Sequence, residues 1–488
     1  MPSRFPRAVL YLSLLPVLLA AGCDRGRRDG PVRVSVMGSE KEVEAPLAHI
    51  GTRAGQVVFA ATAQGLVSYD AAGDVIPGLA QRWIVVDDGR SYIFRLRRAK
   101  WLNGKRVDAR DVRRLLLARM EREVARDPYG IMASVDEVLA MTGDVIEIRL
   151  VAPQPDFLLA MAQPEMGVAL PDGGTGPYRR TGESKEKGVL LLAPVEDADE
   201  GVTEPKAHER LVLRAERPSR ALARFTGGKA DLVLGGTLAE FPYIALGEVP
   251  PRTVRFDPVQ GLFGLALSPD TPMFADANVR EALSMAIDRQ AIIGYFDMSR
   301  WKIAEQILPQ QLNLPHPPTA PGWSAMSMED RRNFAIGVIA RWQAQHGGKP
   351  VELSIALSPG PGMSLLFLAL KAQLQAIGIT VRQVEKKGDL TLIDEVAPYD
   401  SVVWYLGRLS CARKVHCDKA AEDLLKQSVK ATDMSARLFL LGQAEPLIQR
   451  HNGFIPLAMP VRWSLAASRL NGFQPSPRGD RSLRGLVE

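Results

Sequence analysis

Residues 76–97 read IPGLAQRWIVVDDGRSYIFRLR, and this stretch indicates the fold class more clearly than any other. Two runs of largely apolar residues lie on either side of Asp87-Asp88-Gly89. An Asp-Gly pair between two such runs is the strongest short signal for a β-hairpin. Asp108 and Asp111 follow with the spacing of a helix N-terminus, where one caps the helix and the other occupies its first turn. We therefore expect a hairpin and then a helix that ends near Arg122.

Strand and helix patterns mix along the rest of the chain, without a regular βαβ count or an internal repeat. The expected strands are 32–37, 145–150, 232–234, 263–267, 351–357, 379–381 and 400–405. The expected helices are 154–162, 219–225, 278–293, 364–376, 420–429 and 435–449. A chain of 488 residues exceeds the usual size of a single core. We expect an α/β protein of two or three lobes.

Composition and charge exclude several classes of protein. Hydrophobic residues make up 46% of the chain and charged residues 24%, which is typical of a soluble globular protein. The net charge of +6 comes largely from five arginines within the first thirty residues: Arg4, Arg7, Arg25, Arg27 and Arg28. The remainder is nearly neutral and has no basic stripe with interleaved aromatic residues. A nucleic-acid partner is therefore not expected.

The N-terminus has the pattern of an export signal. An apolar run over residues 8–21 follows two arginines and is too short to span a bilayer comfortably. It ends in Leu-Ala-Ala-Gly before Cys23, as at a bacterial lipoprotein cleavage site. We expect residues 1–22 to be a lipoprotein signal peptide, Cys23 to be lipidated and residues 23–31 to be a flexible tether. The alternative is an ordinary secretory signal with an incidental Cys23; both place the protein outside the cytoplasm.

Two further cysteines, Cys411 and Cys417, have five residues between them. Disulfides persist outside the cytoplasm, so we expect these two to be bonded, with a contribution of roughly 2 kcal/mol to stability. The alternative is a metal site formed with His416. Because His416 and Cys417 are adjacent, they cannot easily aim at one ion, and we expect neither a metal nor a cofactor.

An ordered series of motifs resembles family 5 of the extracytoplasmic solute-binding proteins, which serve ABC importers of peptides, nickel and related solutes. No single motif is specific, but their combined order is, and it spans nearly the whole chain after Cys23. The motifs are GLVSYD at 65–70, IPGLAQRW at 76–83, DDGRSYIFRLR at 87–97, WLNGK at 101–105, DARDV at 108–112, GTGPY at 174–178, NVREALSMAIDR at 278–289, LQAIGI at 374–379 and IPL at 455–457.

This resemblance implies a periplasmic-binding-protein-like fold of type II, in which two mixed α/β lobes close over a solute cleft. The implied first lobe covers residues 32–265 with a subdomain at about 65–165. The second lobe covers 266–455, and 456–488 return to the first. The implied partners are a small solute or peptide and ABC permease and ATPase subunits, for a monomer lipid-anchored to a bacterial membrane and facing the periplasm.

The segment most clearly implied to touch solute is Trp404-Tyr405-Leu406-Gly407-Arg408-Leu409. Trp404, Tyr405, Gly407 and Arg408 are the candidate ligand contacts. In peptide-binding relatives an acidic residue in the matching stretch holds the amino terminus of the peptide. Leu409 occupies that position here, so a peptide with a charged amino terminus loses its partner. Arg408 could face the cleft and favour an anionic solute, or lie on the surface.

An enzyme is not expected, because the chain has no Gly-x-Ser-x-Gly elbow and no His-Glu-x-x-His helix, and its six histidines are scattered. A second functional class stays open: an exported sensor or accessory protein that keeps the fold without transport. The sequence favours the substrate-binding component of an ABC importer and does not name the solute.

Overall fold

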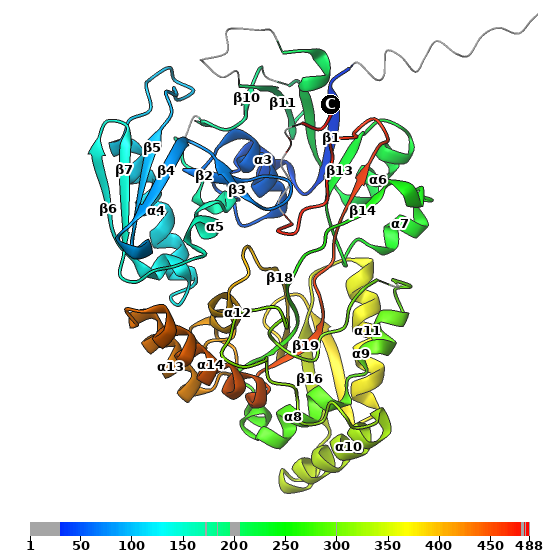
Figure 1. Cartoon of the computed structure of the whole chain (residues 1–488). Helices are drawn as coiled ribbons and strands as arrows, with labels where there is room; N and C mark the ends of the chain where they lie inside the picture. The colour runs from blue at the N-terminus through cyan, green and yellow to red at the C-terminus, as the bar shows by residue number, and fades with distance from the viewer. Residues whose placement is uncertain are drawn as a thin grey trace, which may run out of the picture.

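The computed structural model describes residues 30–170, 173–182, 184–195, 205–298, 300–479, 483 and 485–487. The expected signal peptide, Cys23 and most of the tether lie outside these residues. Two lobes, each built on its own sheet, lie one above the other (Figure 1). No helix among the described residues is both long and apolar enough to cross a membrane.

The first lobe is built on a seven-stranded sheet with strand order β10-β11-β12-β1-β13-β20-β14. Strand β1 is buried along nearly its whole length, as expected of a central strand, and it pairs in parallel with both β12 and β13. The strands are β1 (Val32–Met37), β10 (Tyr178–Arg180), β11 (Val189–Pro194), β12 (Leu211–Glu216), β13 (Leu232–Thr237), β14 (Val254–Phe256) and β20 (Arg462–Ala466). The helices of this lobe are α2 (Glu40–Glu44), α3 (Arg53–Thr62), α6 (Pro218–Thr226) and α7 (Pro242–Leu246).

A subdomain lies beside this sheet, and its centre is the predicted hairpin. Strands β4 (Ala80–Val86) and β5 (Ser91–Leu96) pair antiparallel, and Asp88 takes the left-handed conformation in the turn. Asp108 accepts a hydrogen bond from the Arg110 amide and caps α4 (Ala109–Arg126), as expected. The sheet order is β4-β5-β7-β6. The remaining elements are β2 (Val67–Tyr69), β3 (Val75–Pro77), β6 (Val135–Thr142), β7 (Val145–Leu150), α5 (Phe157–Met161), β8 (Ala169–Leu170) and β9 (Gly173–Gly174).

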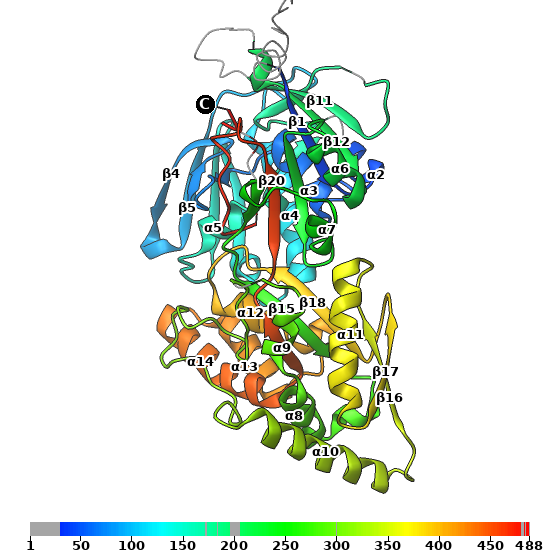
Figure 2. The same cartoon turned by 90° about the vertical axis from the view of Figure 1, so that its right-hand side faces the viewer.

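The second lobe is built on a five-stranded sheet with order β17-β16-β18-β15-β19. Long helices pack around it and bury a continuous apolar core (Figure 2). The strands are β15 (Gly261–Leu267), β16 (Val351–Ala356), β17 (Ile379–Val384), β18 (Leu390–Val396) and β19 (Phe454–Ala458). The helices are α8 (Ala277–Ala286), α9 (Arg289–Gly294), α10 (Met328–Gln345), α11 (Pro361–Gln375), α12 (Val402–Arg408), α13 (Lys419–Lys430) and α14 (Met434–His451).

The chain crosses between the two sheets twice. It leaves the first sheet after β14 and enters the second at β15, and it returns between β19 and β20. The expected lobe boundaries at 265 and 455 fall inside β15 and β19, so the connecting segments are 257–260 and 459–461. Both segments are short, which limits the relative motion of the lobes to a hinge.

One expected helix, 278–293, is wrong as a single element. It is interrupted at Ile287, whose backbone is extended, and Asp288 then caps α9 through the Ala291 amide. Arg289 is buried and donates hydrogen bonds to the carbonyl oxygens of Ala304 and Pro456.

Candidate functional site

A cavity of about 250 Å³ lies between the two lobes and is the candidate solute cleft. Its walls come from both sheets and from the return segment, so that lobe movement must open or close it. Its charged and polar lining includes Arg53, Gln56, Glu123, Arg126 and Glu165 of the first lobe, Asp394, Glu395, Trp404 and Arg408 of the second lobe, and Asp257, Arg462 and Arg478 of the connecting and return segments.

The segment with the candidate ligand contacts is a helix, so the expected strand at 400–405 is wrong. Residues Val402–Arg408 form α12 and are all buried. One turn of this helix directs Trp404 and Arg408, four residues apart, to the cleft. Tyr405 and Gly407 are buried and do not line it. The structure therefore brings two of the four candidates to the cavity.

Arg408 is neither a surface residue nor a free cation in the cleft. Its side chain is about 7% exposed and lies between two carboxylates. Its Nη1 is 3.2 Å from Asp127, at the end of α4, and its Nε is 2.8 Å from Glu395 on β18. Burial raises the pKa of Asp127, and the charge of Arg408 opposes that shift. The guanidinium also lies 5.3 Å from the centre of the Trp404 ring on the same helix. Because Asp127 belongs to the first lobe and Glu395 to the second, this arginine joins the two lobes.

A second arginine cluster surrounds Asp394 at the other side of the cleft. Arg462, on the strand after the return crossing, lies 2.7 Å from the Asp394 carboxylate. Arg53, at the start of α3, lies 4.0 Å from it and donates to the carbonyl oxygen of Gly235. Removal of Arg53 from bulk water lowers its pKa to about 9, with the charge of Arg462 adding to the shift. Arg53 therefore remains a cation at neutral pH.

Every carboxylate that lines the cavity has a partner within the protein. Asp394 and Glu395 are held by Arg462 and Arg408. The other three are held as follows: Glu123 lies 3.9 Å from Arg126, Glu165 accepts from Gln56 and Asp257 accepts from the Ser476 amide. The Leu409 side chain is buried in the core and offers no further carboxylate. Each carboxylate among the described lining residues therefore already has a partner, and a free ammonium group would have to compete for it.

Two hydrogen-bond donors at the cleft have no partner among the described residues. They are the indole Nε1 of Trp404 and the Nε of Arg478, both shielded from solvent. A buried donor without a partner costs on the order of 1–3 kcal/mol, which a bound acceptor would recover. Two residues that line the cleft, Trp404 and Arg478, therefore carry buried donors that lack an acceptor among the described residues.

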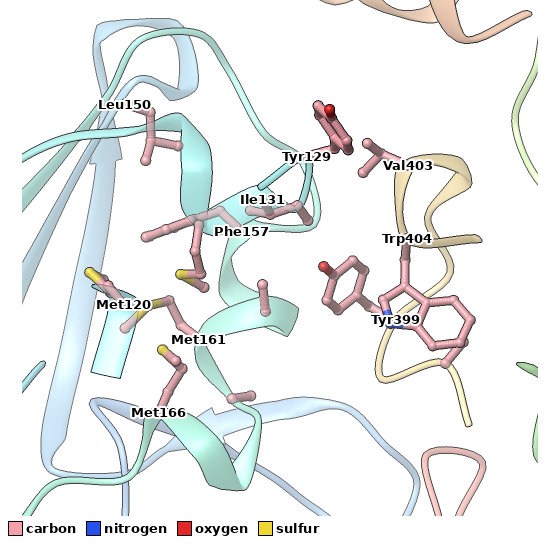
Figure 3. Close-up of a cluster of buried hydrophobic side chains, with 14 of the residues drawn as sticks. Met120, Tyr129, Ile131, Leu150, Phe157, Met161, Met166, Tyr399, Val403 and Trp404 are labelled. Atoms are coloured by element: carbon pink, nitrogen blue, oxygen red, sulfur yellow. The ribbon is translucent and has the colours of Figure 1, made fainter. Parts of the chain in front are cut away.

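Apolar contacts also close the lobes on the subdomain side. Tyr399, Val403 and Trp404 face Ile131 and Phe157 of the subdomain, and all five belong to one buried cluster (Figure 3).

A polar contact lies next to this cluster. The Tyr129 hydroxyl donates to Glu422, on α13 of the second lobe, and Glu422 also accepts from the Cys411 amide. Cys411 and Cys417 are joined by a disulfide, with their Cα atoms 5.1 Å apart. The short disulfide loop thus helps to hold the carboxylate that joins the two lobes.

The cysteines do not form the alternative metal site. Their sulfurs are bonded to each other, and the ring of His416 lies 2.9 Å from that of His451. Among the described residues there is no group of three or more His, Cys, Asp or Glu side chains placed to hold a metal ion.

Sequence reasoning missed Arg53, Asp127, Asp394 and Arg462. These residues come from four elements that are far apart in the chain, and none belongs to a motif with a known chemical role. The one local signal for the cleft is the pair Gly235-Gly236, which lines the cavity. The Trp463 ring leaves no room for a Cβ at Gly236, so that position requires glycine.

Comparison with known proteins agrees with this fold. The model of the family described as bacterial extracellular solute-binding proteins, family 5 middle, matches residues 74–398. A periplasmic oligopeptide-binding protein, OppA of Haemophilus influenzae, is 22% identical over 87% of this chain and 87% of its own.

Two solved structures share the fold. The complex of Haemophilus influenzae OppA with the peptide RPPGFSPFR has a TM-score of 0.77 at 18% identity, over 94% of this chain and 99% of that one. The murein tripeptide binding protein MppA of Escherichia coli has a TM-score of 0.75 at 20% identity, over 92% of this chain and 96% of that one. At these identities the likeness establishes the fold and not the solute.

Proposed function

The chain belongs to the bacterial extracellular solute-binding proteins of family 5, and from that premise we propose which solute its cleft accepts. Relatives of this family are periplasmic binding proteins, and this one captures a substrate for an ABC importer. We propose a small solute that carries hydrogen-bond acceptors and needs no free ammonium group. The observation that supports this is the pairing of every cleft carboxylate beside the two unpartnered donors of Trp404 and Arg478.

The size of the cavity supports the same proposal. Ligand sites for drug-sized molecules have volumes of about 300–1,000 Å³. At about 250 Å³ the cleft is small for a peptide of many residues. A nonapeptide such as RPPGFSPFR, which one solved relative binds, is larger than this cavity.

Native mass spectrometry of freshly purified protein tests the proposal by identifying a co-purified solute. Isothermal titration then compares a dipeptide with a free amino terminus and the same dipeptide N-acetylated. We expect the acetylated form to bind at least as tightly, because no carboxylate is free for the ammonium group. A strong preference for the free amino terminus would overturn the solute class but leave the family and the importer role intact.

Trp404→Phe is the sharpest variant for this site. It removes the indole N–H and keeps an aromatic ring in the core. We expect about five- to tenfold weaker binding of the co-purified solute, from the loss of one hydrogen bond. Loss of the indole N–H should change the melting temperature of the solute-free protein little, since that N–H has no partner among the described residues. Unchanged affinity would exclude Trp404 as a ligand contact.

The N-terminal residues concern export and attachment to the membrane. We propose that residues 1–22 are a lipoprotein signal peptide, that Cys23 is lipidated and that the mature protein is a monomer held at the membrane. The apolar run before Cys23 supports the first two. We also propose that the protein binds its solute without catalysing a reaction on it. Metabolic labelling with a fatty-acid analogue should mark the wild type and not a Cys23→Ala variant.

A further inference from the structure

A second hollow lies on the first lobe and shares no lining residue with the cleft. Its volume is about 740 Å³. Its lining residues come from the connection between α2 and α3, from α3 and α4, and from β8, β9 and β10. Its apolar lining residues are Leu47, Ile50, Phe59, Leu102, Leu115 and Leu170.

Arg119 of α4 lines this hollow and is an unusual buried arginine. The residue is 7% exposed, and its guanidinium lies 5.2 Å from the centre of the Phe59 ring. No carboxylate of the described residues lies within ion-pair distance of it, and no hydrogen bond of its side chain is found within the same part of the chain. Arg289 and Arg408 are as deeply buried, yet they donate to carbonyl oxygens or face carboxylates.

The other charges around the hollow do not compensate Arg119. Arg122, Arg179 and Arg180 also line it and add positive charge. Glu44 is the one carboxylate in the described lining, and it accepts from the Gly188 amide. Burial lowers the pKa of Arg119, and the charge of Arg122 lowers it further against a smaller opposing effect of Glu165. A buried cation without a counter-ion is costly, and a bound anion would remove that cost.

We propose that this hollow binds a small amphipathic anion, whose acidic group pairs with Arg119 and whose apolar body covers Phe59 and the leucines. The site is separate from the cleft, and the inference does not depend on the solute that the cleft carries. A carboxylate or a sulfonate satisfies the guanidinium equally, because both offer acceptors to its N–H groups.

Decanoate and decanol form the matched ligand pair for the test, since they share the apolar chain and differ in charge. Binding is measured by displacement of the fluorescent anion 1-anilinonaphthalene-8-sulfonate and by titration calorimetry. We expect decanoate to bind about tenfold or more tightly than decanol. Equal binding of the two would overturn the proposal.

Arg119→Met is the matched variant, because methionine fills similar space without the charge. We expect its affinity for decanoate to fall about tenfold, to that of decanol. Its melting temperature without ligand should hold or rise, since no partner is left unpaired. Decanoate should raise the melting temperature of the wild type and not of the variant.

Two controls separate this site from the cleft. Arg382→Met, at an exposed position on β17 of the second lobe, should bind decanoate like the wild type. Trp404→Phe should also leave decanoate binding unchanged, and Arg119→Met should leave cleft binding unchanged. If Arg119→Met bound decanoate as the wild type does, the arginine would be excluded as the anion partner whatever the state of the cleft.

Discussion

Arg408 is the cation that lies between two carboxylates of different lobes. Asp127 and Glu395 would repel each other in the closed cleft, and the guanidinium between them turns that repulsion into attraction. We expect Asp127→Asn to lower the free energy of unfolding by about 2–3 kcal/mol, because Arg408 then keeps one buried partner of two. Urea denaturation measures it.

A double-mutant cycle supplies the control for this prediction. In an Arg408→Met background, the change of Asp127 to asparagine should cost much less, since the charge that it served is absent. Equal costs in the two backgrounds would show that Asp127 stabilises the protein through its contact with the Tyr129 amide and not through the ion pair.

His451 makes stability depend on pH. Its ring lies beside His416 and Arg280, and burial, followed by these two charges, lowers its pKa to about 4. Asp418, 3.7 Å away, opposes the shift. An unfolded histidine titrates near 6.5, so the unfolded chain binds the proton more tightly. Stability is complete above about pH 6.5 and falls as the pH drops toward 4, by up to about 3 kcal/mol from this group.

Unfolding by urea at pH 7 and at pH 5 measures this loss. His451→Gln should remove most of the difference between the two pH values, because glutamine keeps a polar contact and does not titrate there. His346→Gln, at an exposed position that stacks on Trp342, should retain it. A loss that is the same in wild type and His451→Gln would assign the acid sensitivity to other groups.

At the scale of one element, α12 shows why a short apolar run is ambiguous. Residues 400–405 contain valines and aromatic residues and read as a strand, but such a run does not distinguish a strand from a buried helix. The helix forms because it packs against α14 and against the end of α4, which is distant in the chain. The hairpin turn at 87–89 and the helix cap at Asp108 were predictable because their signals are local.

Gly407 gives α12 a testable constraint. A Cβ at this position would lie 3.0 Å from the Asp127 carboxylate, so the glycine permits the close approach of the two lobes. Glycine to alanine within a helix ordinarily stabilises by about 0.5–1 kcal/mol. We expect that gain for Gly337→Ala in α10, where the nearest atom is the flexible end of Arg341. Gly407→Ala should instead destabilise, as measured by thermal unfolding of both variants. A gain at both positions would contradict the constraint.

At the scale of the whole molecule, the sequence predicted two lobes and an inserted subdomain, and it could not predict the cleft. The lobes follow from length, strand patterns and an ordered series of motifs. The cleft depends on pairs such as Arg53 with Asp394 and Tyr129 with Glu422, which are hundreds of residues apart. Nothing local in the sequence marks such pairs. The residues that flank an arginine do not show whether it lies on the surface or is buried between two lobes.

These pairs hold the lobes together through the protein's own side chains. Tyr129 donates to Glu422, Arg413 donates to the carbonyl oxygen of Arg126, and the Tyr399–Trp404 cluster is buried against the subdomain. A solute shifts an equilibrium between open and closed forms only by its difference in affinity for the two. Since internal contacts already favour closure, we expect the wild-type protein to be compact without solute. Small-angle X-ray scattering should then give nearly the same radius of gyration with and without it.

Tyr129→Phe combined with Asp127→Asn should shift this equilibrium, since it removes two polar links between the lobes and leaves the two sheets intact. We expect a larger radius of gyration for the solute-free double variant, and a return to the wild-type value when the co-purified solute is added. Tyr243→Phe, on α7 of the first lobe and away from the described contacts between the lobes, is the matched control and should not expand. If the wild-type protein expands as much as the double variant when solute is removed, then the solute, and not these side chains, holds the lobes closed.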